Sequence, residues 1–266
     1  YHMSRGQRVL CLAYKDIGAK YKVSDLKKRG RSFLEKDMIF AGFAVFECPL
    51  KPDSYRIVNE LKSSSHSAVM ITGDAALTAA EVARQVGIID TEPKTTYDLR
   101  EMKRILPDGF EESAFAFVPI DALPGEYTPE ECIAFVPGNI PVLRDLVDKS
   151  ELSLCLSGDA ITKVAIAAVK SSWDPKKTHH LPIDVTTVLR DPAARNVLKA
   201  LVPLISVFAR HSPRQKEAVI MALNDAGRTT LMCGDGTNDV GALRQAHVGI
   251  SILNGKLNLS GFDVSC

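Results

Sequence analysis

The feature that most constrains the fold of this sequence is a regular alternation of apolar runs of strand length with segments of helical periodicity. Residues 68–72, 152–156, 206–209 and 229–233 are such runs, and a segment of helical period follows each of them. Strands and helices in this order form a mainly parallel sheet with helices on its faces. We therefore expect an α/β protein with a three-layer sandwich around a mainly parallel sheet.

Residues that begin and end helices support this division. Ser212 stands before Pro213, and Asp191 stands before Pro192, which is the order typical of an N-cap and a first helical residue. Gly227 follows the helical pattern that Pro213 opens and is expected to end that helix.

The opening of the chain departs from the alternation. An expected strand at residues 9–14 is followed by a polar, basic helix at residues 24–36, and we assign residues 1–37 to a separate unit. The nearly all-apolar run at residues 39–46 is typical of a strand covered on both faces, so the main domain is expected to begin just before it. Because the first residue is Tyr1 and not methionine, we expect a piece of a longer protein.

The main domain is expected to span residues 38–254 and to contain one insertion. Residues 88–150 carry many Pro, Gly and acidic residues with only short apolar pieces, which predicts an insertion mounted on the surface. A polar loop is expected around residues 173–180, and residues 255–266 are expected to form a tail.

The composition excludes several classes of function. The chain has 33 basic and 32 acidic side chains, so it lacks the basic excess of a nucleic-acid or membrane-surface binder. Its six cysteines are scattered without a Cys-x-x-Cys pair, which indicates reduced thiols in the cytosol. No stretch approaches the roughly 20 continuous apolar residues of a membrane helix. The partner must therefore be sought in short motifs.

The strongest motif is the string Cys233-Gly234-Asp235-Gly236-Thr237-Asn238-Asp239, which begins at the carboxyl end of an apolar strand. Open α/β sheets bind their ligands at this end of their strands. Two carboxylates four residues apart suit Mg²⁺, which takes one or two carboxylates together with phosphate oxygens and water. The alternative is a turn with a helix N-cap, where Asn and Asp make only local hydrogen bonds.

A second strand end carries Thr72-Gly73-Asp74. A hydroxyl and free backbone N–H groups at a helix start can bind phosphate, because the unpaired donors and the positive end of the helix dipole coincide. The same string also fits a capped turn. Ser157-Gly158-Asp159 has the same look after its own strand, and we interpret that copy as structural.

Lys216 lies in the first turn of the helix that Pro213 opens. An ammonium group there can act as a point charge on a transferring phosphoryl group. A single lysine is usually a surface residue, but here the order along the chain is a hydroxyl, then this lysine, then the paired acids. That order matches one active-site plan.

In this order the residues resemble the HAD superfamily. The strings Thr72-Gly73-Asp74, FARHSPRQKE at residues 208–217 and GDGTNDVGALRQAHVGI at residues 234–250 are similar to those of P-type ATPases. Residues 70–88, 207–217 and especially 233–249 further resemble the A group of type V, endoplasmic-reticulum membrane proteins implicated in extracting misinserted transmembrane helices. The resemblance covers residues 8–254 and implies a HAD-like Rossmannoid fold.

The resemblance also implies the domain organisation. Residues 1–37 would be a remnant of the nucleotide-binding domain, and residues 38–254 would be the phosphorylation domain. Residues 255–266 would lead toward a membrane domain. The relatives that pump ions usually have an acidic residue and two prolines where this chain has Glu47-Cys48-Pro49-Leu50-Lys51.

By the same resemblance, the motif residues would share one catalytic site. Asp235 and Asp239 would bind Mg²⁺, and Asn238 would complete the network around the phosphate. Thr72-Gly73 and Lys216 would hold the phosphoryl oxygens.

Three further residues would contact the nucleotide. Asp74 would lie near the phosphates of ATP, together with Lys216. Arg210 would reach the ribose, and Arg8 would contact ATP from the nucleotide-binding unit.

One departure from the family is an absence. The family accepts the phosphate on the aspartate of a DKTGT string, and no such string occurs in the 266 residues. We therefore expect part of an ATPase of the endoplasmic-reticulum membrane that faces the cytosol, works through an aspartyl phosphate and moves a substrate, expected to be transmembrane helices. Its expected partners are ATP and the actuator and transmembrane domains of the same polypeptide, without nucleic acid. The isolated chain is expected to be inactive and monomeric.

Two alternatives remain. A soluble HAD-family phosphatase also uses a paired-acid string, although such enzymes carry their nucleophile near the start of the same chain. A non-catalytic HAD-like interaction module would keep the fold without Mg²⁺-dependent nucleotide binding.

Overall fold

A six-stranded mixed sheet forms the centre of the computed structural model, which describes residues 2, 5–17, 21–47, 49–89, 95–105, 111–122, 127–172 and 184–252. The strand order is β3-β8-β7-β4-β5-β6. These strands are β3 (Met70–Ile71), β4 (Thr95–Ile105), β5 (Glu111–Pro119), β6 (Ile133–Phe135), β7 (Leu152–Ser157) and β8 (Val207–Ala209). The first four in this order run parallel, and β5 and β6 continue antiparallel. The predicted α/β class with a mainly parallel sheet is thus confirmed.

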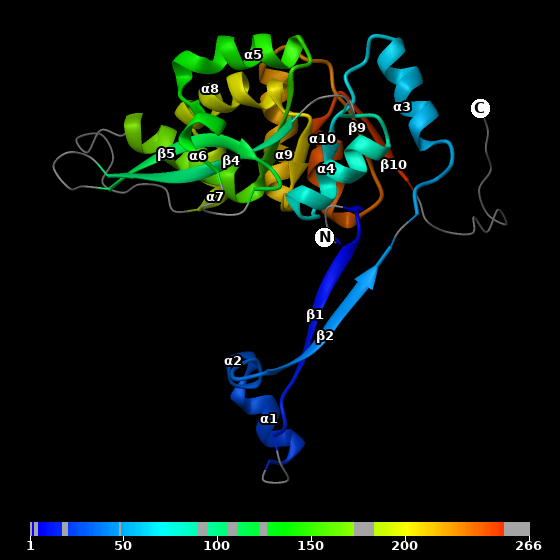
Figure 1. Ribbon diagram of the computed structural model, residues 1–266, viewed down its shortest axis with the longest axis vertical. Helices are drawn as coiled ribbons and strands as arrows, with labels where there is room; N and C mark the ends of the chain where they lie inside the picture. Colours follow the sequence, from blue (N-terminus) through cyan, green and yellow to red (C-terminus); the bar gives the residue numbers. More distant parts are fainter. Residues whose placement is uncertain are drawn as a thin grey trace.

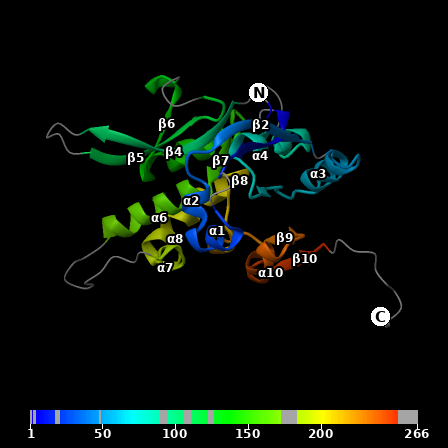
Figure 2. The ribbon, with the colours of Figure 1, turned by 90° about the horizontal axis from the view of Figure 1, so that it is seen from below.

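Helices cover both faces of this sheet (Figure 1). The covering helices are α4 (Ala76–Gln85) on one face and α6 (Gly158–Ser172), α8 (Pro192–Leu201) and α9 (Pro213–Asp225) on the other. Strand β7 shows why, since its side chains alternate between the faces: Leu154 and Leu156 join the larger apolar cluster, and Cys155 joins the cluster on α4. Figure 2 shows α4 and α6 on opposite sides of β7 and β8.

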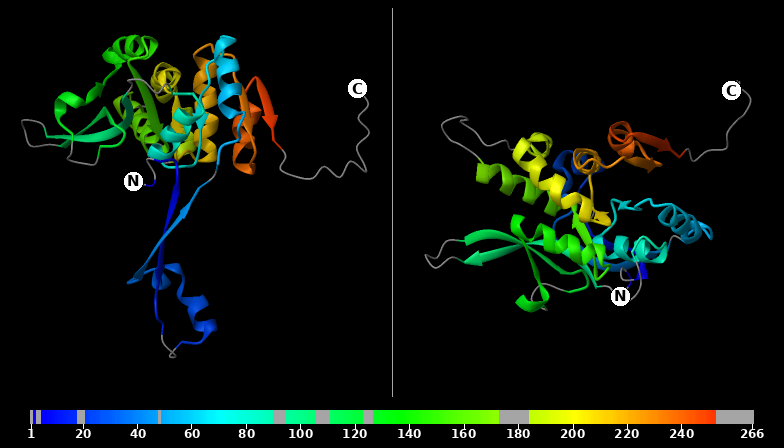
Figure 3. Two further views of the ribbon diagram at one scale, coloured as in Figure 1. Left: turned by 45° about the vertical axis from the view of Figure 1, so that its right-hand side comes forward. Right: turned by 90° about the horizontal axis from the view of Figure 1, so that it is seen from above.

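A second, two-stranded parallel sheet consists of β9 (Leu231–Gly234) and β10 (Val248–Ser251), joined through α10 (Val240–Gln245). It lies beside α9 at one end of the molecule, coloured orange to red in Figure 3. Ile71 of β3 packs against the cluster that contains Met232 of β9. Within the described residues, however, β3 pairs only with β8 and β9 only with β10, so each presents an open edge.

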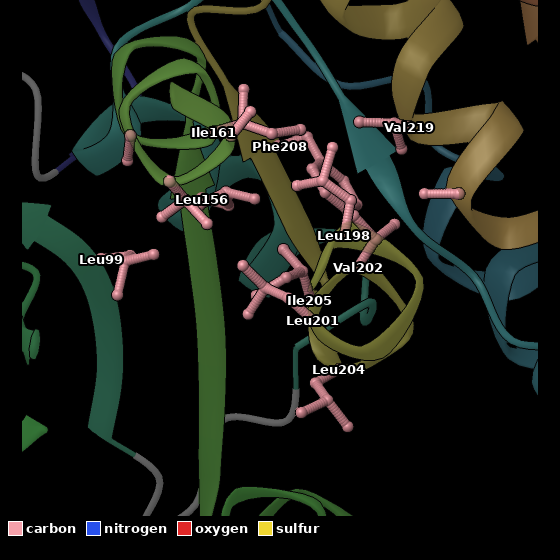
Figure 4. Close-up of a cluster of buried hydrophobic side chains, with 14 of the residues drawn as sticks. Leu99, Leu156, Ile161, Leu198, Leu201, Val202, Leu204, Ile205, Phe208 and Val219 are labelled. Carbon is pink, nitrogen blue, oxygen red and sulfur yellow. The ribbon is translucent and has the colours of Figure 1, made fainter. Parts of the chain in front are cut away.

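The main core lies between the central sheet and the helices α6, α8 and α9. Phe208 of β8, Leu156 of β7 and Leu198 of α8 are fully buried there, with Ile161 of α6 and Val219 of α9 around them (Figure 4). Burying side chains of this size contributes about 1.5–3 kcal/mol each. The core therefore fixes β8 and α9, and the loop of residues 210–212 connects these two segments.

The opening of the chain is an antiparallel ribbon that projects away from the body (Figures 1 and 3). It consists of β1 (Arg8–Tyr14) and β2 (Ile39–Phe46), with α1 (Val23–Arg29) and α2 (Arg31–Leu34) at its far end. The predicted first strand is confirmed. The single helix expected at residues 24–36 is instead broken at Gly30, whose φ of 75° lies in the left-handed region.

The prediction that residues 39–46 are covered on both faces is wrong. The strand pairs with β1 alone among the described residues, and Phe43 remains 65% exposed. An all-apolar run therefore did not mean a buried strand here. The pairing also links residues on either side of the boundary expected near residue 38.

The segment at residues 88–150 is not mounted on the surface as predicted. Strands β4, β5 and β6 extend the central sheet, because β4 pairs in parallel with β7. Leu99, Phe117 and Leu143, the last from α5 (Ile140–Asp148), are fully buried. Acidic residues such as Asp98, Glu101 and Glu112 lie within these strands and interrupt their apolar pattern in the sequence.

The remaining helices are α3 (Ser54–Ser63) and α7 (Val185–Arg190). The predicted N-caps are confirmed: the Asp191 carboxylate accepts from the Ala193 N–H at 2.8 Å, and the Ser212 N–H donates to Gln215 Oε1 at 2.8 Å in a capping box. No helix among the described residues is long and apolar enough to cross a membrane. The polar loop expected at residues 173–180 and the tail at residues 255–266 lie outside the described residues.

Candidate functional site

The turn after β3 is closed by its own side chains. Thr72 Oγ1 lies 3.1 Å from Asp74 Oδ2 and also accepts from the Asp74 N–H at 3.1 Å. Gly73 is exposed, and a Cβ there would meet no atom within 4 Å. The turn therefore presents the backbone around Gly73 to solvent, as a phosphate-binding turn must.

Two backbone hydrogen bonds join this turn to the end of β8. The Arg210 N–H donates to Asp74 O at 2.9 Å, and the His211 N–H donates to Thr72 O at 3.0 Å. Arg210 has a φ of 56°, a left-handed conformation that costs a non-glycine residue roughly 1 kcal/mol. These bonds hold the loop in that conformation, with the Arg210 side chain exposed beside Asp74.

Lys216 and Asp239 form a buried ion pair at the amino end of α9. The Lys216 ammonium donates to Asp239 Oδ1 at 2.7 Å, and the two side chains are only 11% and 8% exposed. The second carboxylate oxygen accepts from the Gly236 N–H at 3.4 Å. Removing either partner would leave an uncompensated buried charge, which is strongly destabilising.

Glycine is required beside this pair. A Cβ on Gly234 would lie 2.7 Å from the Cβ of Asp239 and 2.9 Å from its Oδ2. At Gly236 the nearest atom would be 3.8 Å away, so that position is open. The first glycine of the motif therefore lets the Asp239 carboxylate sit against the end of β9.

The same turn exposes Asp235, Thr237 and Asn238. The described residues contain no cluster of three or more His, Cys, Asp or Glu side chains that could hold a metal alone. Two carboxylates on one short turn nevertheless fit Mg²⁺, which keeps several waters and completes its shell with substrate phosphates. Asp235 and Asp239 are the two carboxylates of this turn that could hold such an ion.

The structure thus brings most of the predicted residues to one end of the sheet. The segment from Arg210 to Lys216 connects the turn of Thr72 with the ion pair at Asp239. Arg8 is the exception, since it begins the ribbon strand β1 opposite Phe46. Within the described part of the chain, no hydrogen bond or ion pair joins it to the other motif residues.

The look-alike string at Ser157-Gly158-Asp159 has a packing role. A Cβ on Gly158 would lie 2.3 Å from the backbone oxygen of Arg210, and Gln215 Nε2 donates to the Gly158 oxygen at 2.6 Å. The start of α6 is thereby pressed against the loop before α9. This agrees with the structural interpretation of that string.

Sequence reasoning missed His211, which follows Arg210 directly. Its side chain is 4% exposed, and burial, with a smaller effect of the nearby Lys216 charge, lowers the pKa of His211 to about 4. A single histidine after a strand carries no signal of burial in the sequence, because burial here depends on the path of the loop that follows the left-handed Arg210.

Most of the chain is similar to a segment of several ATPases that are much longer. No family model matches the chain. The chain is 39% identical over 98% of its length to the probable manganese-transporting ATPase PDR2 of Arabidopsis thaliana. It is 37% identical over 96% of its length to the endoplasmic reticulum transmembrane helix translocase spfA of Aspergillus fumigatus, and 35% identical over 94% to the endoplasmic reticulum transmembrane helix translocase of Saccharomyces cerevisiae. The chain spans only 16–18% of the length of these relatives.

Proposed function

Because this chain belongs to the type V P-type ATPases, we propose that it forms the ATP-handling and phosphorylation part of such an enzyme. The observation that carries the proposal is the buried Lys216–Asp239 pair at 2.7 Å, set beside the exposed Asp235 at a strand end. A structural ion pair alone would explain neither the exposed second carboxylate nor the close fit of Gly234.

Each motif residue has a role in this proposal. Asp235 and Asp239 would hold Mg²⁺, which when bound offsets charge on the transferring phosphoryl group. The Lys216 ammonium would donate to phosphoryl oxygens, from its present position 2.7 Å from Asp239 Oδ1. The N–H groups around Gly73 and the Thr72 hydroxyl would orient the same oxygens.

The outer residues would bind the rest of the nucleotide. Asn238, exposed on the turn of Asp235, would complete the phosphate network, and Asp74 would lie near the nucleotide phosphates. Arg210, exposed beside Asp74, would reach the ribose, and Arg8 would contact ATP from the ribbon.

The aspartate that accepts the phosphate would come from another stretch of the polypeptide. Two open strand edges support this. Among the described residues, strand β3 has ladder bonds only to β8, through the Met70 N–H to Ser206 O and the Thr72 N–H to Phe208 O, while Leu231 of β9 is 61% exposed. A parallel strand between β3 and β9 would bury that edge and end at the rim where Thr72 and Asp239 lie.

The finer assignments follow from the same family. We propose a HAD-like arrangement with a nucleotide-domain remnant at residues 1–37 and a phosphorylation domain at residues 38–254. The parent would be an enzyme of the endoplasmic-reticulum membrane with this part in the cytosol. We propose transmembrane helices as its substrate, because the two fungal relatives are named as helix translocases.

Calorimetric titration of ATP with and without Mg²⁺ tests the binding role. We expect the wild-type chain to bind ATP more tightly with Mg²⁺, and Asp235→Ala to lose this gain because one of two carboxylate ligands is removed. Asp159→Ala is the matched control, since Asp159 follows Gly158 as Asp235 follows Gly234. Both side chains are exposed, but Asp159 pairs with Lys163. Equal binding with and without Mg²⁺ would favour the interaction module instead.

Incubation with ³²P-labelled ATP tests the origin of the nucleophile. The chain is expected to form no acyl phosphate, because no aspartate of a DKTGT string is present. Stable labelling that hydroxylamine removes would contradict the proposal that the acceptor lies on another stretch, and would favour the soluble phosphatase.

A further inference from the structure

The imidazole of His211 has one tautomer and one free lone pair. Its Nδ1 lies 2.9 Å from the backbone oxygen of Ala209, and a carbonyl oxygen can only accept, so Nδ1 carries the proton. Nε2 is then an acceptor. The ring also meets Phe208 edge-on at 5.5 Å between centroids, which places it on the same face of β8 as the Phe208 side chain.

That acceptor has no partner. Among the described residues, His211 Nε2 is one of two buried side-chain N or O atoms without a hydrogen bond, and the other is Asp98 Oδ1. An unsatisfied buried polar atom costs roughly 1–3 kcal/mol. Such an atom in a native structure calls for an explanation, for instance a donor that arrives in another state.

Among the described residues, the ammonium of Lys216 is the charge that acts on the pKa of His211. Phe208 packs in the cluster that includes Ala218 and Val219 of α9, so the imidazole lies on the face that α9 covers. Side chains of a helix lean toward its amino end, which directs Lys216 back toward the loop that holds His211. Burial first, and repulsion by Lys216 second, keep the pKa of His211 at about 4 and the imidazole neutral at pH 7.

An ammonium group has three donors, and the described residues give that of Lys216 one side-chain acceptor, Asp239 Oδ1 at 2.7 Å. Any cation that binds Asp239 competes for that same carboxylate. When it does, the buried ammonium needs another acceptor, and the lone pair of His211 is the unsatisfied buried nitrogen, in the described part of the chain, on which its charge acts.

We propose that His211 is a positioning residue, whose Nε2 accepts a hydrogen bond from the Lys216 ammonium when Asp239 is occupied or neutralised. The ammonium then stays at the ends of β8 and β9 and does not swing into solvent. The hydrogen bond itself does not depend on ATP. Its use in phosphoryl transfer rests on the proposed function.

The first test is NMR of the chain labelled with ¹⁵N-histidine. In Asp239→Asn the ammonium loses its ionic partner, so the Nε2 resonance of His211 should move upfield to the position of a hydrogen-bonded acceptor. The shift should be absent in the double variant Asp239→Asn with Lys216→Met. This variant keeps the uncharged side chain at position 239 but removes the ammonium donor. An unmoved Nε2 signal in folded Asp239→Asn would overturn the proposal. If the uncompensated ammonium prevents that variant from folding, the Mg²⁺ titration of the His211 variants decides instead.

The second test distinguishes the roles of the two ring nitrogens of His211. Variants of His211 are titrated with Mg²⁺, and binding is followed in the NMR spectrum of the chain. His211→Gln places an amide near the position of Nε2, whereas His211→Asn places one near Nδ1. We expect Mg²⁺ affinity within about twofold of wild type for Gln and roughly tenfold weaker for Asn, since a hydrogen bond to a charged group is lost. The reverse order would assign His211 a purely structural role through Ala209.

The two proposals fail separately. A wild-type chain without Mg²⁺ binding would refute the proposed function, while the Nε2 shift in Asp239→Asn would still decide the role of His211.

Discussion

The buried carboxylate of Asp98 should make the wild-type protein less stable at neutral pH than a variant with an uncharged side chain at this position. Asp98 lies on β4 opposite Cys155 of β7 and is 8% exposed. Its Oδ2 lies 3.6 Å from Arg100 Nε, and its Oδ1 has no hydrogen-bond partner among the described residues. Burial, only partly offset by the Arg100 charge, raises the pKa of Asp98 from 3.8 to about 6.

This shift fixes the sign and size of the effect. Between pH 3.8 and about 6 the folded protein holds a proton that the unfolded chain has lost, so the free energy of unfolding falls as pH rises through this window. The contribution of the protonated form is complete below pH 3.8 and is lost above about pH 6. A shift of this size corresponds to about 3 kcal/mol.

Asp98→Asn keeps the shape of the side chain and removes the charge. Arg100 remains satisfied in this variant, because its guanidinium also donates to the backbone oxygens of Ala122 at 2.8 Å and Ile120 at 3.2 Å. We expect the variant to match wild type near pH 4 and to exceed it by up to about 3 kcal/mol at pH 7.

Urea unfolding followed by circular dichroism at intervals between pH 4 and pH 7 measures the difference. Asp159→Asn is the control, because that side chain is 75% exposed and solvent screens its pairing with Lys163, so no difference should grow with pH. The reasoning is refuted if Asp98→Asn is less stable than wild type at pH 7, or if its advantage is the same at both ends of the range.

Three further predictions concern the site and its surroundings. For His211 the free energy of unfolding changes with pH in the opposite direction, because its pKa falls from 6.5 to about 4 on folding. Wild type should therefore lose about 3 kcal/mol of stability relative to His211→Gln as pH drops through that window, measured by the same urea series. Gly158→Ala should cost about 1–3 kcal/mol in urea unfolding, because its Cβ would lie 2.3 Å from a backbone oxygen, whereas Gly138→Ala meets no atom within 4 Å and should be nearly neutral. Gly234→Ala should weaken Mg²⁺-ATP binding in calorimetry, because the new Cβ would lie 2.7 Å from the Cβ and 2.9 Å from Oδ2 of Asp239 and would displace this proposed Mg²⁺ ligand; Gly236→Ala, with 3.8 Å of space, should weaken it less.

The sequence predicted best those features that depend on a few neighbouring residues. The N-caps at Ser212 and Asp191 are local arrangements, and both are present. The turn of Thr72 and the pair of Lys216 and Asp239 could be placed at strand ends because the motifs directly follow apolar runs. The parallel order of the strands then brought distant motifs to one edge.

Features that depend on pairing between distant segments could not be predicted in this way. Strand β4 lies within a stretch whose average composition suggests an exposed insertion, yet it pairs with β7 and buries Leu99. Strand β2 shows the opposite error. Its apolar run Phe43-Ala44-Val45-Phe46 predicts a buried strand, yet it forms an exposed ribbon with β1. Apolar content reports what a strand could bury, whereas only its neighbours in space decide whether it is buried.

The open edges of β3 and β9 connect these observations to the proposed chemistry. Apolar side chains that remain exposed, such as Leu231 at the edge of β9, and an unpaired ladder on β3 are costly for a sheet that ends there. The motif residues around Asp239 are already ordered without any third strand, through Lys216 and the Gly236 N–H. The chain therefore holds its proposed Mg²⁺ ligand Asp239 and its lysine in place by itself, and a strand that brought a nucleophile into that gap would complete the proposed site without rearranging it.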